Sequence, residues 1–481
     1  MKTGNAKQIA GSISKELVTT WDLFDTLVAR FHMDPVHAFA MVEAKFPGHD
    51  FIRRRTSAQQ SLDAVGAPYV IHDIYRQMVA DGLPSSTADQ LLVEEIKAEE
   101  LLLLPIRASI EQVSDADIVV TDMYLSEQQI SNIVWKVCGL RTLRPAVRSN
   151  WGKASGTIWP QILRHYFIRF HIGDNLRSDI EIPKKYGIET VHFTASQMSK
   201  WERKLSDLGH SHLALVLRES RLRGLGSDAG PIHQILTGPY LTLLYAFSVW
   251  LYSTYGDGRA RFAFLRRDCE DLARVFSSMF PFLEVNQIDL TRTISYVNDP
   301  DFNAVIASQI DTNSILVDML TSGMSAFRFL NQAQVGISRL VTLVYLDSVL
   351  PAERKVAHKE QLDALGFDFV ATSTELAKHH YPLECLLQTL HPPVTSLGRD
   401  PDSGGITRSH GKSDLAGDEA KLIEFKNTLV QEFIDSLQRR GFEPCTAESA
   451  LVLIRDALAA ILDSTFIVHQ FPSFLVRERN S

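Results

Sequence analysis

The chain has 481 residues, which is long enough for two or three domains of ordinary size. A formal net charge of −8 and a pI near 6.1 argue against a nucleic acid as the main partner. The four cysteines are widely spaced without a CxxC pattern, and the N-terminus has no apolar signal segment. Both features favour a cytoplasmic protein with reduced thiols.

The first strand signal ends in two carboxylates. Apolar Leu17 and Val18 predict the end of a buried strand, and Asp22 and Asp25 follow it three residues apart. A carboxylate at the carboxyl end of a parallel strand faces the crevice where such sheets bind ligands. Asp22 can therefore be a ligand of Mg²⁺ or a nucleophile that forms an aspartyl-phosphate. These residues alone leave a plain strand followed by an Asp-rich turn as an equal alternative.

A mostly helical segment follows this strand. Asp34-Pro35 predicts a helix start, and further helical patterns run roughly over 50–65, 71–81 and 86–103. We expect these helices to form a cap of about residues 31–110, inserted directly after the first strand. Arg55 on the cap is a candidate substrate contact, with an ordinary surface arginine as the alternative.

Two further strands, expected over 116–121 and 166–172, also end in polar residues. Helical patterns lie between them, and a last strand is expected at 190–193, so the region predicts a doubly wound parallel sheet. The polar residues are Thr121, Asp122 and Tyr124 after the first of these strands, Lys153 in the next long loop, and Asp174, Asn175 and Asp179 after the second.

Loops at the carboxyl ends of neighbouring parallel strands converge, so we expect one site. Asp22 and Asp174 can hold Mg²⁺, with Asp179 as a further ligand or a supporting carboxylate. The Thr121 hydroxyl can bind phosphate oxygens, and Lys153 can neutralise charge that develops in the transition state. A solvated lysine is the alternative for Lys153. Tyr124 can either line the pocket or pack under the cap.

The order of these residues resembles the four motifs of the haloacid dehalogenase-like hydrolase superfamily. The resemblance covers about residues 15–195 and implies a Rossmann-like, Mg²⁺-dependent phosphatase in which Asp22 is the nucleophile. It also implies that the backbone carbonyl of Phe24 joins Asp22, Asp174 and Asp179 at the metal. The residues expected near the substrate are Asp122, Tyr124, Asn175 and Arg55.

The amino-acid sequences of the motifs are more similar to those of one bacterial subgroup of that superfamily. Its members carry Phe-Asp-x-Phe-Asp-Thr-Leu, Ser-Asp-Met-Tyr-Leu and, in a second domain, Phe-Leu-x-Arg-Asp. Here the corresponding stretches are Trp21 to Leu27, Thr121 to Leu125, and Phe264 to Asp268. Members often occur beside surface-polysaccharide genes and are mostly described only as predicted hydrolases.

One residue departs from the phosphatase pattern. The second Asp of the first motif, which protonates the leaving group, is replaced by Phe24. The chain could then be weakly active, use a substrate with a good leaving group, or take the acid from elsewhere. Dehalogenases also lack this acid, but they need no Mg²⁺, and Asp174 with Asp179 would then have no purpose. We therefore expect a phosphatase for a small phosphorylated metabolite such as a sugar phosphate. The alternative is a catalytically weak module that binds a phosphorylated ligand or a protein partner.

The expected domains are a hydrolase core at 1–200, a linker at 201–235 and a second α/β domain at 236–481. Strands are expected over 261–265, 286–290, 314–317 and 340–346, and helices over about 417–440 and 446–463. Residues 395–416 predict a mobile loop or hairpin. The uncharged stretch Leu236 to Gly256 is expected as a buried helix rather than a membrane span.

One turn in the expected second domain is also a candidate ligand-binding site. The sequence Thr321-Ser322-Gly323 follows an apolar strand and precedes a helix, so its backbone N–H groups could cradle a phosphate. It loosely resembles the diphosphate-sugar loop of phosphoribosyltransferases, although Asp318 is only one of the usual two acidic residues. A Ser/Thr helix cap on a glycine turn is the alternative.

Overall fold

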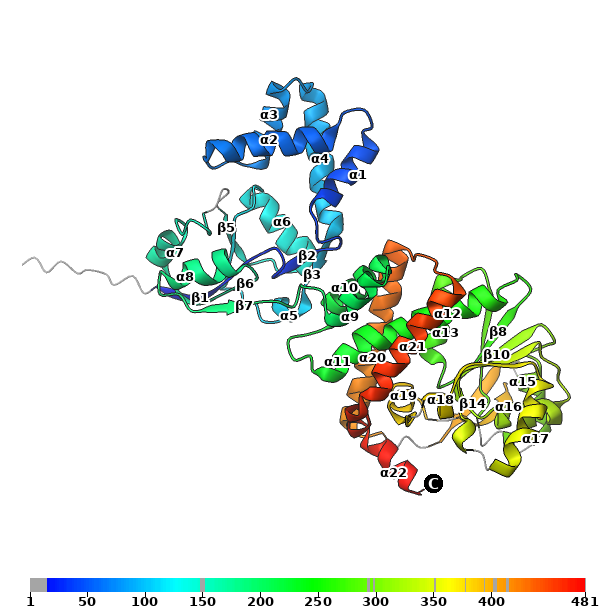
Figure 1. Ribbon diagram of the computed structural model, residues 1–481. Coiled ribbons are helices and arrows are strands. Elements are labelled where there is room, and N and C mark those ends of the chain that lie inside the picture. The colour runs from blue at the N-terminus through cyan, green and yellow to red at the C-terminus, as the bar shows by residue number, and fades with distance from the viewer. Residues whose placement is uncertain are drawn as a thin grey trace, which may run out of the picture. The chain divides into compact units, whose positions relative to one another are not determined.

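The structure, a computed structural model, describes residues 15–147, 152–291, 295–296, 299–349, 352–376, 378–392, 394–400, 405–411 and 415–480 (Figure 1). The chain divides into two compact units: Met1–Ser199 with Leu225–Asp228, and Lys200–Gly224 with Ala229–Ser481. Each unit contains a five-stranded sheet in which all neighbouring strands are parallel. The expectation of α/β structure in both halves is confirmed.

The sheet of the first unit has the order β5-β4-β1-β6-β7. Its strands are β1 (Glu16–Trp21), β4 (Ile118–Thr121), β5 (Arg144–Val147), β6 (Tyr166–Gly173) and β7 (Thr190–His192). Trp21 at the end of β1 pairs with Val119 of β4 and Ile172 of β6. The two strands that end in the predicted polar loops therefore flank the strand that ends before Asp22.

The inserted segment is helical, as predicted, with α1 (Val36–Lys45), α2 (Phe51–Val65), α3 (Ile71–Ala80) and α4 (Ser85–Leu102). The first helix begins at Val36 with Pro35 at its cap position, one residue later than Asp34-Pro35 predicted, and the backbone N–H of Val36 donates to Asp34 Oδ1 at 2.9 Å. A short antiparallel pair, β2 (Val28–Arg30) with β3 (Leu103–Pro105), joins the two ends of the insertion. Three-residue strands are too short to show an alternating pattern, and neither was predicted.

Helices α5 (Arg107–Ile110), α6 (Glu127–Cys138), α7 (Trp159–His165) and α8 (Ile182–Lys184), with the π-helix η1 (Leu176–Glu181), complete the first unit. One apolar core joins the sheet to the cap, since Trp21 and Val119 pack in the same cluster as Phe39 and Leu91. A second cluster contains Val18 of β1 together with residues of β4 and α7. The cap is thus part of the folded unit rather than an appendage.

The sheet of the second unit has the order β12-β11-β10-β8-β9. Its strands are β8 (Arg261–Leu265), β9 (Glu284–Ile288), β10 (Ser314–Thr321), β11 (Arg339–Tyr345) and β12 (Phe367–Thr372). Numbered within the unit, this order is 2-1-3-4-5, in which the chain reverses direction across the sheet between β8 and β10. The edge strand β12 was not predicted, because it is interrupted by the polar Asp368 and is only partly buried.

The segment 201–235, expected as a linker, is folded. Helices α9 (Lys200–Asp207), α10 (Ser211–Gly224) and α11 (Pro231–Ile235) occupy it, and all three belong to the second unit. The side chains of Leu213 and Leu217 are buried, and Glu202 forms an ion pair with Arg221. The high charge of this segment therefore reflects paired side chains on packed helices.

The uncharged stretch forms π-helix η2 (Leu236–Tyr240) and α12 (Leu241–Tyr255). The continuous helix Pro231–Tyr255 is long and apolar enough to cross a membrane, but 83% of its most apolar window is buried inside the protein. The expectation of a buried helix is confirmed.

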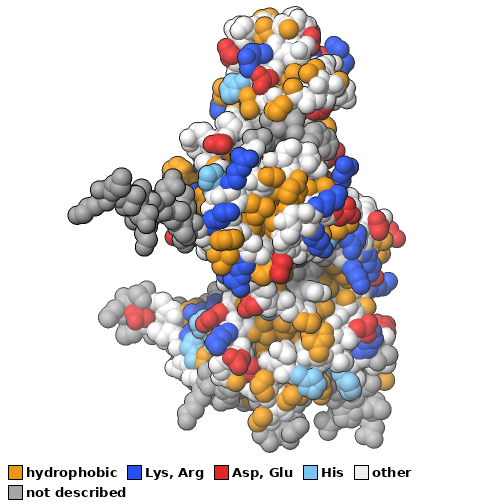
Figure 2. Space-filling model, turned by 90° about the vertical axis from the view of Figure 1, so that its left-hand side faces the viewer, with side chains coloured by type: hydrophobic (Ala, Val, Ile, Leu, Met, Phe, Trp, Pro, Cys, Tyr) orange, Lys and Arg blue, Asp and Glu red, His pale blue; other side chains and the backbone are white. Residues whose placement is uncertain are grey.

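On the face shown in Figure 2, basic and acidic side chains are interspersed with apolar ones.

The expected loop or hairpin at 395–416 is an antiparallel hairpin of β13 (Val394–Arg399) and β14 (Ile406–His410). The remaining elements are α13 (Glu270–Met279), α15 (Pro300–Ala307), α16 (Met324–Ala333), η3 (Asp347–Val349), α17 (Ala352–Asp363), α18 (Ser373–Leu376), α19 (Tyr381–Leu386), α20 (Gly417–Arg440), α21 (Ala447–Asp463), η4 (Thr465–Gln470) and α22 (Pro472–Asn480).

Candidate active site

Three carboxylates meet at the carboxyl ends of β1 and β6. Asp22 follows β1, Asp174 follows β6, and Asp179 lies one turn later in η1. One carboxylate oxygen from each lies within 4.8 Å of the other two. The backbone N–H of Asp22 donates to Ile172 O at 2.8 Å, which fixes the β1 loop against β6. The structure therefore brings the predicted acidic residues into one cluster.

Lys153 lies inside this cluster rather than in solvent. Its side chain is buried, and Nζ forms ion pairs with Asp22 Oδ1 and with Asp179 Oδ1, the latter at 2.6 Å. Asp122 fixes the surrounding loop, because its Oδ1 accepts from the Lys153 N–H at 2.7 Å and its Oδ2 from the Ala154 N–H at 3.2 Å. Asp122 thus positions the lysine loop, and its predicted contact with the substrate stays a prediction.

The Asp179 carboxylate already has three donors. Oδ1 lies 3.1 Å from His171 Nε2 and 2.6 Å from Lys153 Nζ, and Oδ2 accepts from the Asn175 N–H at 2.9 Å. A Cβ on Gly173 would come within 2.4 Å of Asp179 Cγ, so only glycine leaves room for this carboxylate. Of the two predicted roles for Asp179, the three donors favour the supporting carboxylate over the direct metal ligand.

His171, for which the sequence favours a strand-end residue over a catalyst, contacts the carboxylate cluster through Asp179. It is fully buried on β6, and its Nδ1 lies 2.9 Å from Thr20 Oγ1 while Nε2 faces Asp179. An ionised Asp179 requires a proton on Nε2, so we assign Nδ1 as the acceptor of the Thr20 hydroxyl. The available signal was the spacing of two residues between His171 and Gly173, which puts both on one face of β6.

Burial shifts the pKa values of the carboxyl groups in the cluster. It raises the pKa of Asp22 to about 8, since Lys153 offsets only part of the effect of burial and of the charges on Asp179 and Asp174. Burial, with the charges of Asp25 and Asp179, raises the pKa of Asp174 to about 6. Burial also opposes the charge on Asp179, but its bonds to His171 and Lys153 outweigh this and lower its pKa. Without a cation, the three carboxylates resist being ionised together.

Phe24 and Asp25, in the loop that follows β1, make different contacts. The Phe24 ring lies under the Arg30 guanidinium, with Cζ 4.3 Å from the ring centroid. Asp25 adopts a left-handed conformation with φ of 56°, and its N–H donates to Val28 O at 2.6 Å. Its charge reaches Asp174, whose pKa it raises. Asp25 therefore lies close enough to Asp174 to influence the carboxylate cluster.

Arg55 lies neither on the surface nor toward the carboxylates. Its guanidinium is fully buried in the cap, where Nε lies 2.8 Å from Glu95 Oε2 and Nη2 donates to Glu95 Oε1 at 2.9 Å. The Tyr75 hydroxyl donates to the same carboxylate at 2.6 Å. Arg55 Cζ also lies 4.9 Å from the Tyr124 ring, so Tyr124 packs under the cap, as one of its two predicted roles required.

Asn175 and Thr121 have simpler surroundings. The Asn175 side-chain oxygen accepts from the N–H groups of Arg177 and Ser178, each at 3.0 Å, and so caps η1. Its side chain supports the turn that carries Asp179, and the predicted contact with a substrate stays a prediction. Thr121 is buried as the last residue of β4, next to β1.

The cluster suits a hard divalent cation. Carboxylate oxygens are the ligands that Mg²⁺ takes from proteins, and a bound cation would stabilise the ionised forms that burial disfavours. Asp174 is only partly buried, and its carboxylate makes no hydrogen bond to the side chains of the described residues. The residues that would hold the cation are therefore Asp22 and Asp174. A contribution from the carbonyl of Phe24 stays a prediction.

No protein-family model matches the chain, and no curated protein matches it.

Proposed function

We propose that the first unit is a Mg²⁺-dependent phosphohydrolase of the haloacid dehalogenase-like superfamily, with a Rossmann-like core and a helical cap. The observation that carries this proposal is the cluster of Asp22, Asp174 and Asp179 around the buried amine of Lys153. The strand order, in which β4 and β6 flank β1, agrees with it. Mg²⁺ bound at Asp22 and Asp174 would screen charge between the nucleophile and the phosphate.

Asp22 is the proposed nucleophile. Its carboxylate oxygen attacks phosphorus, the bond to the leaving oxygen breaks, and an aspartyl-phosphate forms. Water then hydrolyses this intermediate to inorganic phosphate and regenerates the Asp22 carboxylate. Lys153 neutralises negative charge beside the reacting carboxylate, and the Thr121 hydroxyl donates to a phosphate oxygen. Asp179, with its neutral partner His171, holds Lys153 in place.

The cap is proposed to select the substrate. Its helices share a core with the sheet and cover the Tyr124 loop through the Arg55–Tyr124 contact and the bond from Ile71 N–H to Tyr124 O at 2.7 Å. A small phosphorylated metabolite, such as a sugar phosphate, is the substrate class that fits this proposal.

The test is turnover of phosphate esters by the full chain with Mg²⁺ and with a chelator. We expect hydrolysis that needs Mg²⁺ and that Asp22→Asn abolishes, because an amide is not a nucleophile. Asp89→Asn, which removes an exposed carboxylate of α4, is the matched control and should retain activity. Equal turnover with Asp22→Asn would disprove the nucleophile assignment.

A second candidate is a catalytically weak module that binds a phosphorylated ligand or a protein partner. Phe24 favours it, since the usual acid is missing and the ring is engaged by Arg30. Binding of a phosphorylated ligand without turnover of any aryl phosphate would support this candidate over the enzyme.

The phosphoribosyltransferase-like activity considered for the second unit has less support. Strand β10 runs to Thr321 and α16 begins at Met324, so the turn is short. The Thr321 hydroxyl accepts from the Gly323 N–H at 3.0 Å, which supports a turn-capping role for this residue.

A further inference from the structure

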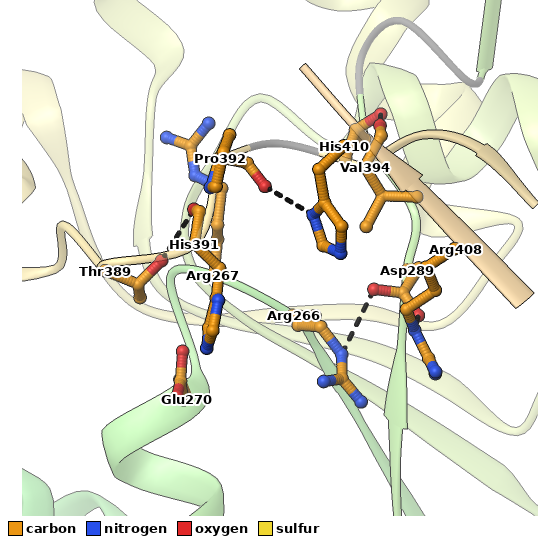
Figure 3. Close-up of a pocket in the computed structure, with 11 residues that line it drawn as sticks. Arg266, Arg267, Glu270, Asp289, Thr389, His391, Pro392, Val394, Arg408 and His410 are labelled. Carbon is orange, nitrogen blue, oxygen red and sulfur yellow. Dashed lines mark hydrogen bonds and ion pairs between the residues drawn. The ribbon is translucent and has the colours of Figure 1, made fainter. Parts of the chain in front are cut away.

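The second unit contains a cavity that the proposed function does not use. It has a volume of about 220 Å³ and lies beyond the carboxyl ends of β8 and β9, beside the β13–β14 hairpin (Figure 3). This volume is smaller than the roughly 300–1,000 Å³ of pockets for drug-sized ligands, so it suits a small ligand or one group of a larger one. The residues that give it chemical character are Arg266, Arg267, Asp289, His391, Arg408 and His410.

Asp289 orients two of the three arginines. Its carboxylate is almost fully buried, with Oδ1 3.1 Å from Arg266 Nε and Oδ2 2.7 Å from Arg408 Nε. Both arginines thus engage Asp289 through Nε, and their terminal nitrogens make no hydrogen bond to the described residues. Figure 3 shows the two guanidinium groups on either side of Asp289 at the edge of the cavity. A buried carboxylate that fixes guanidinium groups prepares them to bind an anion with little loss of side-chain entropy.

Arg267 is held in an unfavourable backbone conformation. Its φ is +80°, a region that residues other than glycine rarely adopt. The side chain lines the cavity, and its Nε lies 3.8 Å from Asp268 Oδ1, a loose ion pair. Strain of this kind concentrates at binding and catalytic sites, where a side chain must be placed in spite of its cost.

The cavity wall also contains two histidine rings and an apolar surface. His410 Nδ1 lies 3.0 Å from Pro392 O, so its N–H donates to that carbonyl and Nε2 is directed away from it. The His391 ring lies 6.2 Å from the His410 ring, and Val394 beside them is buried. Among the described lining residues, three arginines face the two carboxylates Asp289 and Glu270. This local excess of positive charge stands out in a chain of net charge −8.

We propose that this cavity binds the phosphate or diphosphate group of a small organic phosphate. Arg266, Arg267 and Arg408 would bind its oxygens, since guanidinium groups match phosphate geometry and stay charged. The cavity lies beyond the carboxyl ends of β8 and β9, at the edge where parallel sheets bind ligands, although on the other side of β8 from the switch point between β8 and β10. The site is separate from the Asp22 cluster and does not depend on the function proposed for that cluster.

The test measures binding of inorganic phosphate and diphosphate to the full chain by calorimetry. A chelator in the buffer keeps Mg²⁺ from supporting binding at the Asp22 cluster. Arg267→Gly removes one guanidinium and also relieves the unfavourable φ, so this variant should be at least as stable as the wild type. Arg408→Gln removes a second guanidinium. Arg261→Gln is the matched control, because Arg261 begins β8 at the opposite end of the strand, where it pairs with Glu284 and Asp311.

We expect diphosphate to bind and both cavity variants to weaken binding roughly ten- to a hundredfold, the range of one charge-assisted contact. Arg261→Gln should change affinity less than twofold. Hydrogen exchange should slow at residues 265–270 and 405–411 when diphosphate binds. The proposal fails if exchange does not change there, or if Arg261→Gln weakens binding as much as Arg267→Gly. It also fails if acetate binds as well as phosphate, since the site would then select any carboxylate.

Discussion

At Asp22, burial favours the protonated carboxyl, whereas the proposed metal would favour its loss of the proton. The pKa of this carboxyl is raised to about 8 in the folded protein and is about 3.9 in an unfolded chain. The folded state therefore binds more protons than the unfolded state, and the free energy of unfolding of the metal-free protein falls as pH rises from about 4 to 8. A cation that binds the ionised carboxylates should remove this penalty.

We therefore expect Mg²⁺ to raise the melting temperature more at pH 8 than at pH 6. Loss of one proton over this interval can raise the Mg²⁺ affinity up to about a hundredfold, which corresponds to a further increase in Tm of up to roughly 5–10 °C. Thermal unfolding at both pH values, with Mg²⁺ or a chelator, measures it. Asp174→Asn, which removes a proposed ligand, should abolish most of the increase. An equal increase at both pH values would mean that Asp22 is not a ligand.

In the proposed phosphatase, Phe24 stands at the position where an acid would protonate the leaving group. Arg30, which is paired with Glu99, lies over its ring, so a carboxylate introduced there would share Arg30 with Glu99 and stay largely ionised. We expect wild type to hydrolyse aryl phosphates much faster than alkyl phosphates. We expect Phe24→Asp to improve alkyl turnover by less than tenfold, well below the roughly 10²–10⁴-fold of a suitable general acid.

The measurement for Phe24 is kcat for one aryl and one alkyl phosphate in both proteins. If wild type uses both esters equally well, an acid comes from another residue. Asp25 would then be the first to test, because its charge already acts on Asp174. Asp25→Asn is a clean variant, since asparagine tolerates the left-handed backbone at this position.

At the scale of elements, the cap depends on a buried ion pair. Removing one partner of such a pair leaves an uncompensated charge and costs about 3–5 kcal/mol. We expect Arg55→Met to destabilise the protein by about that amount. Arg55→Met/Glu95→Leu should recover part of the loss, because no charge is then left buried, while the buried Tyr75 hydroxyl loses its acceptor. Denaturant unfolding measures both variants.

The same double variant separates packing from substrate binding. If Arg55 only joins the cap to the Tyr124 loop, the KM of the double variant should stay within about twofold of wild type, because no group that touches the substrate has been removed. A stable double variant with a tenfold higher KM would show that Arg55 contacts the substrate after all.

Strands β1, β4 and β6 could be predicted from the sequence because each is an apolar run that ends in polar residues. The convergence of Asp22, Asp174 and Lys153 followed from the parallel arrangement. Other features depend on contacts between distant residues, which leave no local pattern. The Arg55–Glu95 pair spans forty positions, and the roles of Asp122 and His171 appear only once the Lys153 loop and Asp179 are in place. Strand β5, with the sequence Arg-Pro-Ala-Val, has no strand signal at all.

At the scale of the whole molecule, each unit has its own parallel sheet and apolar core, so their chemistry should be separable. All residues proposed for phosphate hydrolysis lie between Asp22 and Asp179. All residues proposed for the anion cavity lie between Arg266 and His410. Apart from Leu225–Asp228, the charged segment 201–235 belongs structurally to the second unit, so a boundary near residue 199 is better supported than one at 235.

We expect a fragment of residues 1–199 to fold and to retain Mg²⁺-dependent aryl phosphatase activity. The fragment keeps the sheet, the cap and their shared core, and it omits only the short stretch Leu225–Asp228 of its unit. In the full chain the Ser227 N–H of that stretch donates to the partly exposed Glu111 at 3.3 Å, a hydrogen bond that contributes little to stability. Circular dichroism and kcat/KM compare the fragment with the full chain, and Asp22→Asn in the fragment is the inactive control.

A folded fragment without activity, beside an active full chain, would show that the second unit supplies part of the catalytic site. A fragment with equal activity would leave the second unit to act on its own ligand, and the diphosphate experiment at Arg267 and Arg408 would then test that role directly.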